Sequence, residues 1–181
     1  MRYTKHQIVR IRDLNEDYFE VVVQRRGLKF QPGDAVTLYN GPEEPIFIAS
    51  GVQEVWCRLI LDKETFSSNF PPGTCSVRLN LELFNPLNSL LAEERPAFIL
   101  TSECIGPFLS FTSTFPQHRL KVCYLGPAKI QEEWISQAHT LIKNVSKMKR
   151  TANRLYVMGN KELLDRKAKK LLKVCKQSYL V

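Results

Sequence analysis

The chain has 181 residues, of which 44% are hydrophobic, and it carries a formal net charge of +8. This length allows one good core or two small domains, the composition excludes wholesale disorder, and no apolar run is long enough to span a membrane. The five cysteines contain no Cys-x-x-Cys pair and no apolar stretch follows the N-terminal charges, so we expect no zinc site, no disulfide framework, no secretory signal and a reducing cytoplasm.

Up to about residue 80 the sequence is typical of short strands separated by turns. Six segments are rich in Val, Ile, Phe, Tyr and Thr, and clusters of Pro, Gly, Asn and Asp lie between them. Strands that recur at roughly 8–12-residue intervals favour a small antiparallel barrel or sandwich. The predicted strands are residues 7–11, 18–24, 35–39, 46–50, 55–61 and 74–79.

After Pro96 the pattern changes to alternating strands and helices. Residues 97–100 form a continuous apolar run, which is expected of a strand covered on both faces. This alternation predicts right-handed βαβ units and a parallel sheet. The other predicted elements are a short helix at 107–115, strands at 120–125 and 155–158, and amphipathic helices at 130–145 and 161–176.

The two patterns meet near residues 84–95, so we expect two domains, 1–90 and 91–181. Charge is divided unevenly between them: the first 94 residues carry 10 Lys and Arg against 13 Asp and Glu, and the remainder carries 16 against 5. Such asymmetry predicts that the second domain faces an anion, which could be a nucleotide phosphate, an acidic protein or nucleic acid. The alternative is a set of solvated basic helix faces.

Five short motifs follow one another along the chain: Pro-Gly-Asp at 32–34 and the segments 44–50, 65–68, 102–108 and 156–159. In this order they resemble the strand opening, the Arg-x-Tyr-Ser-x-x-Ser flavin motif, the Gly-x-x-Ser loop, the Gly-Thr-Gly-Ile-Ala-Pro-Phe nucleotide loop and the final Tyr-Val-Cys-Gly strand of ferredoxin–NADP reductases. The resemblance covers the whole chain. It implies a six-stranded antiparallel flavin-type β-barrel followed by a small, truncated α/β nucleotide-binding-like domain. An oligonucleotide-binding barrel beside an unrelated α/β domain is the alternative.

Several side chains that would bind the flavin are replaced. Where the family has an Arg for a flavin phosphate, a Tyr that stacks on the ring and a Ser that bonds it, this chain has Glu44, Ile46 and Phe47. A carboxylate in place of the cation changes attraction into repulsion, a difference of roughly 1–3 kcal/mol. The positions that the resemblance assigns to a flavin are Ile46, Phe47, Ile48, Ser50, Thr65, Ser67, Ser68, Gly106 and Pro107.

The nucleotide loop is altered in the same way. Glycines in this loop let backbone N–H groups approach a pyrophosphate, but here Ser102 and Cys104 add side chains and Glu103 adds a negative charge. Met158 replaces the family's cysteine near the nicotinamide. The resemblance therefore leaves FAD as the expected cofactor and argues against a normal NAD(P) site.

Three hypotheses for function remain. The first is a reduced, flavin-dependent oxidoreductase that transfers electrons through atypical flavin contacts. The second is a non-catalytic descendant that binds an acidic protein through its basic C-terminal helices. The third is a nucleic-acid-binding barrel, which the scarcity of aromatic residues among those lysines disfavours. Fold alone does not confer function, so the sequence identifies no catalytic residue and does not decide whether the chain is an enzyme.

Overall fold

The structure is a computed structural model that describes residues 3–39, 45–63, 74–79, 96–117, 120–126, 135, 140–141 and 154–159. The chain forms two compact units. The first contains Met1–Asn88 and Gly106–Thr114, and the second contains Ser89–Ile105 and Phe115–Val181. No helix within the described ranges is long and apolar enough to cross a membrane.

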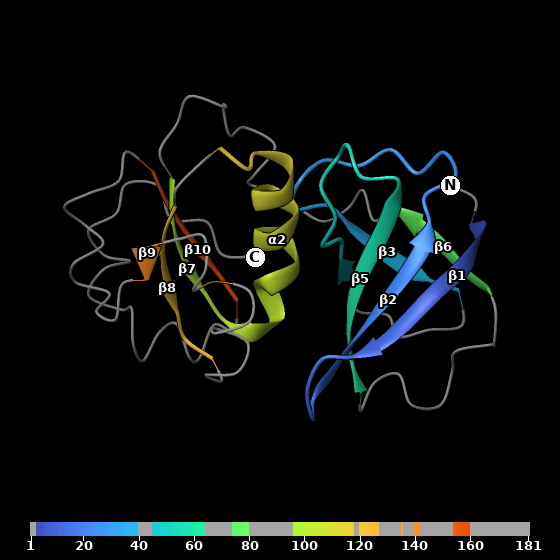
Figure 1. The fold of residues 1–181 in the computed structure, drawn as a ribbon, viewed down its shortest axis with the longest axis horizontal. Coiled ribbons are helices and arrows are strands. Elements are labelled where there is room, and N and C mark those ends of the chain that lie inside the picture. Colours follow the sequence, from blue (N-terminus) through green and yellow to red (C-terminus); the bar gives the residue numbers. More distant parts are fainter. Residues whose placement is uncertain are drawn as a thin grey trace. The chain divides into compact units, whose positions relative to one another are not determined.

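The first unit is an antiparallel barrel of six strands (Figure 1). Its strands are β1 (Thr4–Asp13), β2 (Tyr18–Gln24), β3 (Ala35–Leu38), β4 (Ile46–Phe47), β5 (Trp56–Asp62) and β6 (Thr74–Leu79). They are hydrogen-bonded in the order β4-β3-β6-β1-β2-β5, and every pair is antiparallel. A bridge between Ile48 and Leu59 then joins the two ends of the sheet. The predicted six-stranded antiparallel barrel is confirmed.

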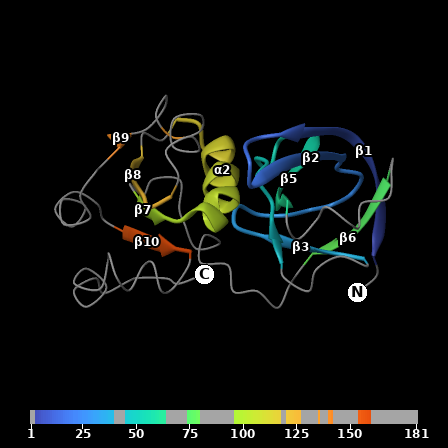
Figure 2. The same ribbon diagram turned by 90° about the horizontal axis from the view of Figure 1, so that it is seen from below.

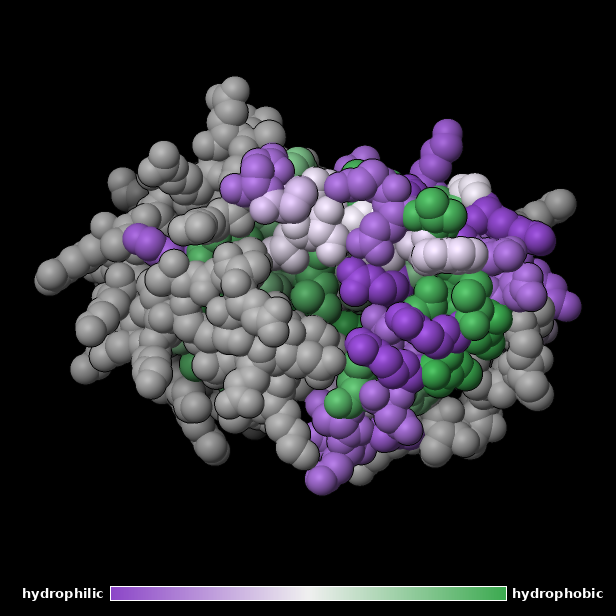
Figure 3. Space-filling view, in the orientation of Figure 1, coloured by the Kyte–Doolittle hydropathy of each residue, from purple (hydrophilic) through white to green (hydrophobic). Residues whose placement is uncertain are grey.

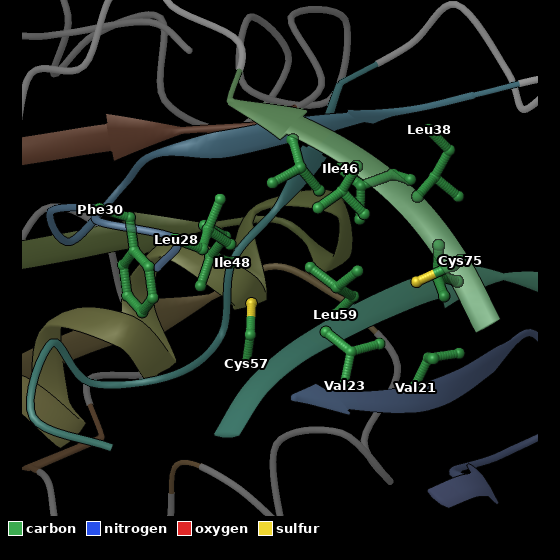
Figure 4. Packing of buried hydrophobic residues seen from close by; sticks show 13 residues of the cluster. Val21, Val23, Leu28, Phe30, Leu38, Ile46, Ile48, Cys57, Leu59 and Cys75 are labelled. Atoms are coloured by element: carbon green, nitrogen blue, oxygen red, sulfur yellow. The ribbon is translucent and has the colours of Figure 1, made fainter. Parts of the chain in front are cut away.

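The barrel interior follows from the alternation of side chains along each strand. In β5, Cys57, Leu59 and Leu61 are buried, whereas Arg58 and Ile60 between them are half-buried. Figure 4 shows these inward positions packed together with residues from the other strands. The buried members of this core are Val21, Val23, Leu28, Phe30, Val36, Leu38, Ile46, Ile48, Cys57, Leu59, Leu61, Cys75 and Val77.

The outer surface of the barrel unit is mixed. Figure 3 shows hydrophilic side chains beside an apolar area on one face of this unit. The large apolar side chains that the described part of the chain leaves exposed are Tyr3, Val9, Ile11, Tyr39, Val55 and Trp56.

Two buried cysteines give the barrel a predicted sensitivity to alkaline pH. Burial raises the pKa of the Cys57 thiol from 9.0 to about 12 and that of Cys75 to about 11. The thiolate therefore forms more easily in the unfolded chain, so stability is fully present below about pH 9 and is lost as the pH rises toward 11–12.

Urea unfolding between pH 8 and 11 should show this loss, with thiol ionisation contributing to the slope. A Cys57→Ala, Cys75→Ala variant, although less stable throughout because of its cavities, should show a flatter slope. Identical slopes for the two proteins would contradict the prediction.

The second unit is built on a parallel sheet. Its strands are β7 (Pro96–Leu100), β8 (Lys121–Tyr124), β9 (Thr140–Leu141) and β10 (Arg154–Met158), in the order β10-β7-β8-β9. All three pairings are parallel. The side chains of residues 97–100 are fully buried, as the apolar run predicted. The predicted parallel sheet is confirmed.

One predicted helix is wrong where the structure can test it. Thr140 and Leu141 lie inside the helix predicted at 130–145, yet they form β9 and pair with Lys121 and Val122 of β8. Apolar residues at helical spacing do not reveal a short strand whose partner lies far away in the sequence. The helix predicted at 161–176 lies outside the described residues.

After β7 the chain makes a 3₁₀ turn at Ser102–Cys104 and then forms helix α2 (Ile105–Thr114). The sequence predicted this helix at 107–115. Residues Gly106–Thr114 group with the barrel, although the chain reaches them only after the first strand of the second unit.

Candidate functional site

The strand-end loop (residues 48–54) connects β4 to β5 and contains the end of the flavin-like motif. Most of its backbone N–H groups donate within the chain. The bonds run from Ile48 N to Asp34 O (3.0 Å), Ala49 N to Arg58 O (2.8 Å), Gly51 N to Glu54 Oε1 (2.8 Å) and Val52 N to Thr114 Oγ1 (3.1 Å). The loop is therefore fixed from both β5 and α2.

Ser50 is fully buried, and two of its polar atoms have internal partners. The backbone N–H of Arg58 donates to Ser50 Oγ at 2.5 Å, and the hydroxyl of Ser110 in α2 donates to the Ser50 carbonyl oxygen at 2.6 Å. A buried hydroxyl held in this way stabilises the loop, and a ligand could reach it only after the surrounding residues move.

The other positions predicted to bind flavin are mostly buried. Ile46 and Ile48 have 7% and 0% of their surface exposed and belong to the barrel core (Figure 4). Gly106 and Pro107 are buried at the start of α2. Phe47 is half-buried, and a Cβ at Gly106 would lie 3.0 Å from Phe47 Cβ, so the helix start fits closely against β4. Thr65, Ser67 and Ser68, together with Glu44, lie outside the described residues.

Two arginines that the motifs did not single out hold the loop. Arg25, at the end of β2, donates through Nη1 to the carbonyl oxygens of Val52 and Glu54, and its guanidinium lies 4.4 Å from the ring centroid of Phe30. Arg58 donates through Nη2 to Ala49 O at 2.9 Å. A sequence signal existed for Arg58: a cation between inward positions of a predicted strand needs partners on the outer face.

Arg58 also belongs to an ion-pair cluster on the outer face of β1, β2 and β5. Its centre is Glu20, whose side chain is only 4% exposed. Glu20 lies 3.0 Å from Arg10, 3.6 Å from Arg12 and 3.8 Å from Arg58. Arg58 pairs with Glu54 as well, at 3.3 Å. The positive charge of Arg58 is therefore already compensated within the barrel.

Helix α2 meets the loop through its C-terminal residues. A Cβ at Gly51 would lie 2.8 Å from the backbone C and O of Ser113, so only glycine allows this approach. The side chain of Gln53 donates to Ser113 O and Thr114 O at 2.8 and 3.2 Å, which satisfies carbonyl groups at the helix end. These contacts explain why the helix groups with the barrel.

The carboxyl edge of the parallel sheet is the second candidate position. The chain passes from β7 to β8 on one side and returns to β10 on the other, so the strand order reverses between β7 and β10. Open α/β sheets bind ligands at such a point. Here Thr101 is 1% exposed, donates its N–H to Met158 O at 3.1 Å and packs so closely that a Cβ at Gly159 would meet its Oγ1 at 1.7 Å.

The loop after β7 also bonds to itself. Cys104 N donates to Thr101 O at 3.2 Å, and Ile105 N donates to Ser102 O. These N–H groups close a 3₁₀ turn, whereas a pyrophosphate site needs them to point at the anion. At the same edge, Ser102 Oγ lies 3.2 Å from the hydroxyl of Tyr124.

These contacts test whether the described residues fit a flavin or a nicotinamide nucleotide. A flavin bound as the resemblance implies needs a stacking side chain and a free donor near the ring. Ile46 faces the core, Phe47 has no polar side-chain group, and the Ser50 hydroxyl is fully buried and accepts a hydrogen bond from the Arg58 N–H. The described residues do not fit either group in that manner. Within the described ranges there is also no cluster of His, Cys, Asp and Glu that could hold a metal ion.

Comparison with solved structures shows the fold. Ferredoxin-NADP+ reductase from Plasmodium falciparum matches with a TM-score of 0.73 and 12% identity, over 99% of this chain and 96% of that chain. A ferredoxin NADP+ reductase from Neisseria gonorrhoeae with bound FAD and NADP matches with a TM-score of 0.69 and 11% identity, over 100% and 98%. Full-length CYP116B46 from Tepidiphilus thermophilus matches with a TM-score of 0.71 and 12% identity, over 98% of this chain but only 28% of its own.

No protein-family model and no curated protein sequence matches the chain. At identities of 11–12%, the likeness establishes the ferredoxin–NADP reductase fold across nearly the whole chain and nothing finer.

Proposed function

We propose that this chain uses the ferredoxin-reductase fold as a binding scaffold, without a flavin held by the strand-end loop or a nicotinamide nucleotide at the sheet edge. One observation supports this proposal: the polar groups at both positions are already bonded within the chain. A ligand would first have to break these bonds, which contribute about 1 kcal/mol each. The side chains that replace the family's motif residues provide few new contacts to the ligand that would offset this loss.

The proposed partner is an acidic protein in the cytoplasm. The basic residues are concentrated after residue 94, where 16 Lys and Arg outnumber 5 Asp and Glu. Charge of one sign speeds the association of an oppositely charged partner and fixes its orientation. In the sequence of the predicted C-terminal helix the lysines are Lys161, Lys167, Lys169, Lys170, Lys173 and Lys176.

Flavin binding is tested by the absorbance spectrum of freshly purified protein, followed by titration with FAD. We expect a colourless protein whose melting temperature FAD does not change, because a ligand stabilises a protein only if it binds the folded state. Absorbance bands near roughly 370 and 450 nm that remain with the protein through gel filtration would overturn the proposal.

The acidic partner is tested with a defined probe, a fluorescent poly-glutamate peptide. We expect binding that weakens as salt is added, and weaker binding after Lys169, Lys170 and Lys173 are changed to glutamine. The matched control changes three basic residues earlier in the chain, Arg26, Lys29 and Lys63, to glutamine. An equal loss in both variants would show a general effect of charge and no docking surface.

A second function, flavin-dependent electron transfer, is favoured by the match to a reductase that holds FAD. In that function the flavin supplies the redox chemistry and this chain only orients it. Since Ser50 is buried and bonded internally, the positions that the sequence motifs leave for holding it are Thr65, Ser67 and Ser68. If the protein does take up FAD, Ser68→Ala should weaken binding more than Ser50→Ala does, whereas Ser50→Ala should mainly lower stability.

A further inference from the structure

Strands β3, β6 and β1 lie side by side in the barrel (Figure 2). Their outer face carries exposed aromatic and basic residues. Val77 of β6 and Leu38 of β3 are buried, so their neighbours Arg78 and Tyr39 point outward. In the same way Lys5 pairs with Ser76 and lies next to the buried His6. We call Tyr3, Lys5, Tyr39 and Arg78 the tyrosine–basic face.

The two tyrosines form an ordered pair at the surface. Their ring centroids are 5.3 Å apart, and the rings meet edge to face at 72°. The guanidinium of Arg78 lies 5.2 Å from the ring centroid of Tyr3. Tyr39 is 62% exposed and Tyr3 is 37% exposed, so ring surface remains open to solvent. Rings that are already positioned lose little conformational entropy when a ligand stacks on them.

The charges of this face differ from those elsewhere on the barrel. The three arginines on the outer face of β1, β2 and β5 each lie within 3.8 Å of the Glu20 carboxylate. Within the described ranges, no carboxylate forms an ion pair with Lys5 or Arg78, and the contact that the structure gives Arg78 is with the ring of Tyr3. The face therefore combines two positive charges with exposed aromatic rings.

We infer that the tyrosine–basic face binds single-stranded nucleic acid. Proteins that bind single strands combine positive charge along the backbone with aromatic side chains on which bases stack. Tyr39 offers the most open ring, and Lys5 and Arg78 on the neighbouring strands supply the phosphate contacts. A duplex hides its base faces and an acidic peptide offers no ring, so a single strand fits this combination best. This inference does not depend on the proposed function, because it concerns a different surface.

The test is fluorescence anisotropy of a labelled oligothymidylate of about 12 nucleotides, a length within the usual site size of a small barrel. We expect micromolar binding at low salt. Tyr39→Ala should weaken it about tenfold, the usual effect of losing one stacked base, while Tyr39→Phe keeps the ring and the affinity. Trp56→Ala is the matched control: Trp56 is 43% exposed but lies on β5, so the change should have no effect.

The phosphate contacts are tested by the salt dependence of the same binding. Each contact to a single strand contributes about 0.7 to the slope of log affinity against log salt. The double variant Lys5→Gln, Arg78→Gln should therefore reduce the slope by about 1.4. Arg10→Gln removes a cation that is paired with Glu20 and should leave the slope unchanged.

Three results would overturn the inference. The first is no oligothymidylate binding up to about 100 μM at low salt, the weak limit of non-specific binding. The second is an equal loss of affinity in Tyr39→Ala and Trp56→Ala. The third is equal or tighter binding of a duplex of the same length, which would mean that charge alone is recognised. If the protein binds the poly-glutamate peptide but not oligothymidylate, the inference is overturned by the first result.

Discussion

Replacing Gly159 by alanine is expected to destabilise the protein by about 2–6 kcal/mol. Gly159 has a φ of +128°, where a side chain adds strain of about 1–3 kcal/mol. The new Cβ would also lie 1.7 Å from Thr101 Oγ1, and overpacking of a buried site costs about 1–3 kcal/mol more. Urea unfolding followed by circular dichroism measures the loss in the free energy of unfolding.

Gly27→Ala is the matched control for this change. Gly27 also has a positive φ, +77°, but a Cβ there would meet nothing within 4 Å. It should therefore cost only the backbone strain, about 1–2 kcal/mol. Adding Thr101→Ala to Gly159→Ala removes Oγ1 and Cγ2 but leaves the Thr101 Cβ at 2.7 Å, so it should recover part of the loss caused by the clash, as a non-additive term in a double-mutant cycle. Equal costs for the two glycine variants would show that Thr101 does not fill the sheet edge.

Arg58→Ala is the second change with a large expected effect, about 2–4 kcal/mol. The variant loses the guanidinium bonds to Ala49 O at 2.9 Å and to Ser113 Oγ at 3.2 Å, as well as the ion pair with Glu54. Bonds to a charged group contribute about 1.5–3 kcal/mol each, and their loss leaves the partly buried Glu54 without its cation. Thermal unfolding gives the total loss.

Hydrogen exchange locates the effect of Arg58→Ala. Glu54 Oε1 accepts from both Arg58 and the N–H of Gly51, so the amide of Gly51 should exchange faster in the variant. Arg58→Lys keeps the charge but not the forked donors, and should recover only part of the stability. Arg10→Ala is the control: Arg10 also contacts Glu20, but it is 58% exposed and should cost no more than about 1 kcal/mol. If Arg10→Ala lowered the free energy of unfolding as much as Arg58→Ala does, the role given to Arg58 would be contradicted.

Most of the barrel could be predicted from the sequence because apolar and polar side chains alternate along its strands. The predicted segments at 18–24 and 74–79 have the same bounds as β2 and β6. The strand predicted at 46–50 is shorter in the structure, since after Phe47 the chain leaves β3 and bonds to β5 through Ile48 and Ala49. Side-chain pattern reports which face is apolar, but it does not report where a strand changes partner.

The second unit was less accessible to prediction. The apolar run at 97–100 identified β7 because a strand buried on both faces has a distinctive composition. The two residues of β9 gave no such signal, since Leu141 fits the apolar stripe of a helix equally well. A strand this short exists only through its pairing with β8, which is a tertiary property.

For the candidate site, the sequence predicted which segment of the chain to consider, but not whether the polar groups of that segment are free to bind a ligand. The motifs pointed to the loop after β4 as the flavin position, which stays a prediction, and the replaced residues argued that a flavin would be held weakly there. They could not show that Ile46 packs in the core, which depends on how the barrel strands close. Nor could they show that Ser50 bonds to Ser110, because that bond depends on a helix 60 residues further along the chain. Arg25 was missed for the same reason: its partners Val52 and Glu54 are distant in sequence.

The assignment of residues Gly106–Thr114 to the barrel has an evolutionary consequence. The polypeptide enters the second unit before β7, contributes Gly106–Thr114 to the first, and then returns to the second, so each unit is made of two separate stretches of sequence. A gene fragment that stopped before residue 96 would encode a barrel lacking the hydroxyls that meet Ser50 O and Val52 N. Recombination at a single breakpoint could not transplant either module intact, so the pair is expected to be inherited, duplicated or lost together.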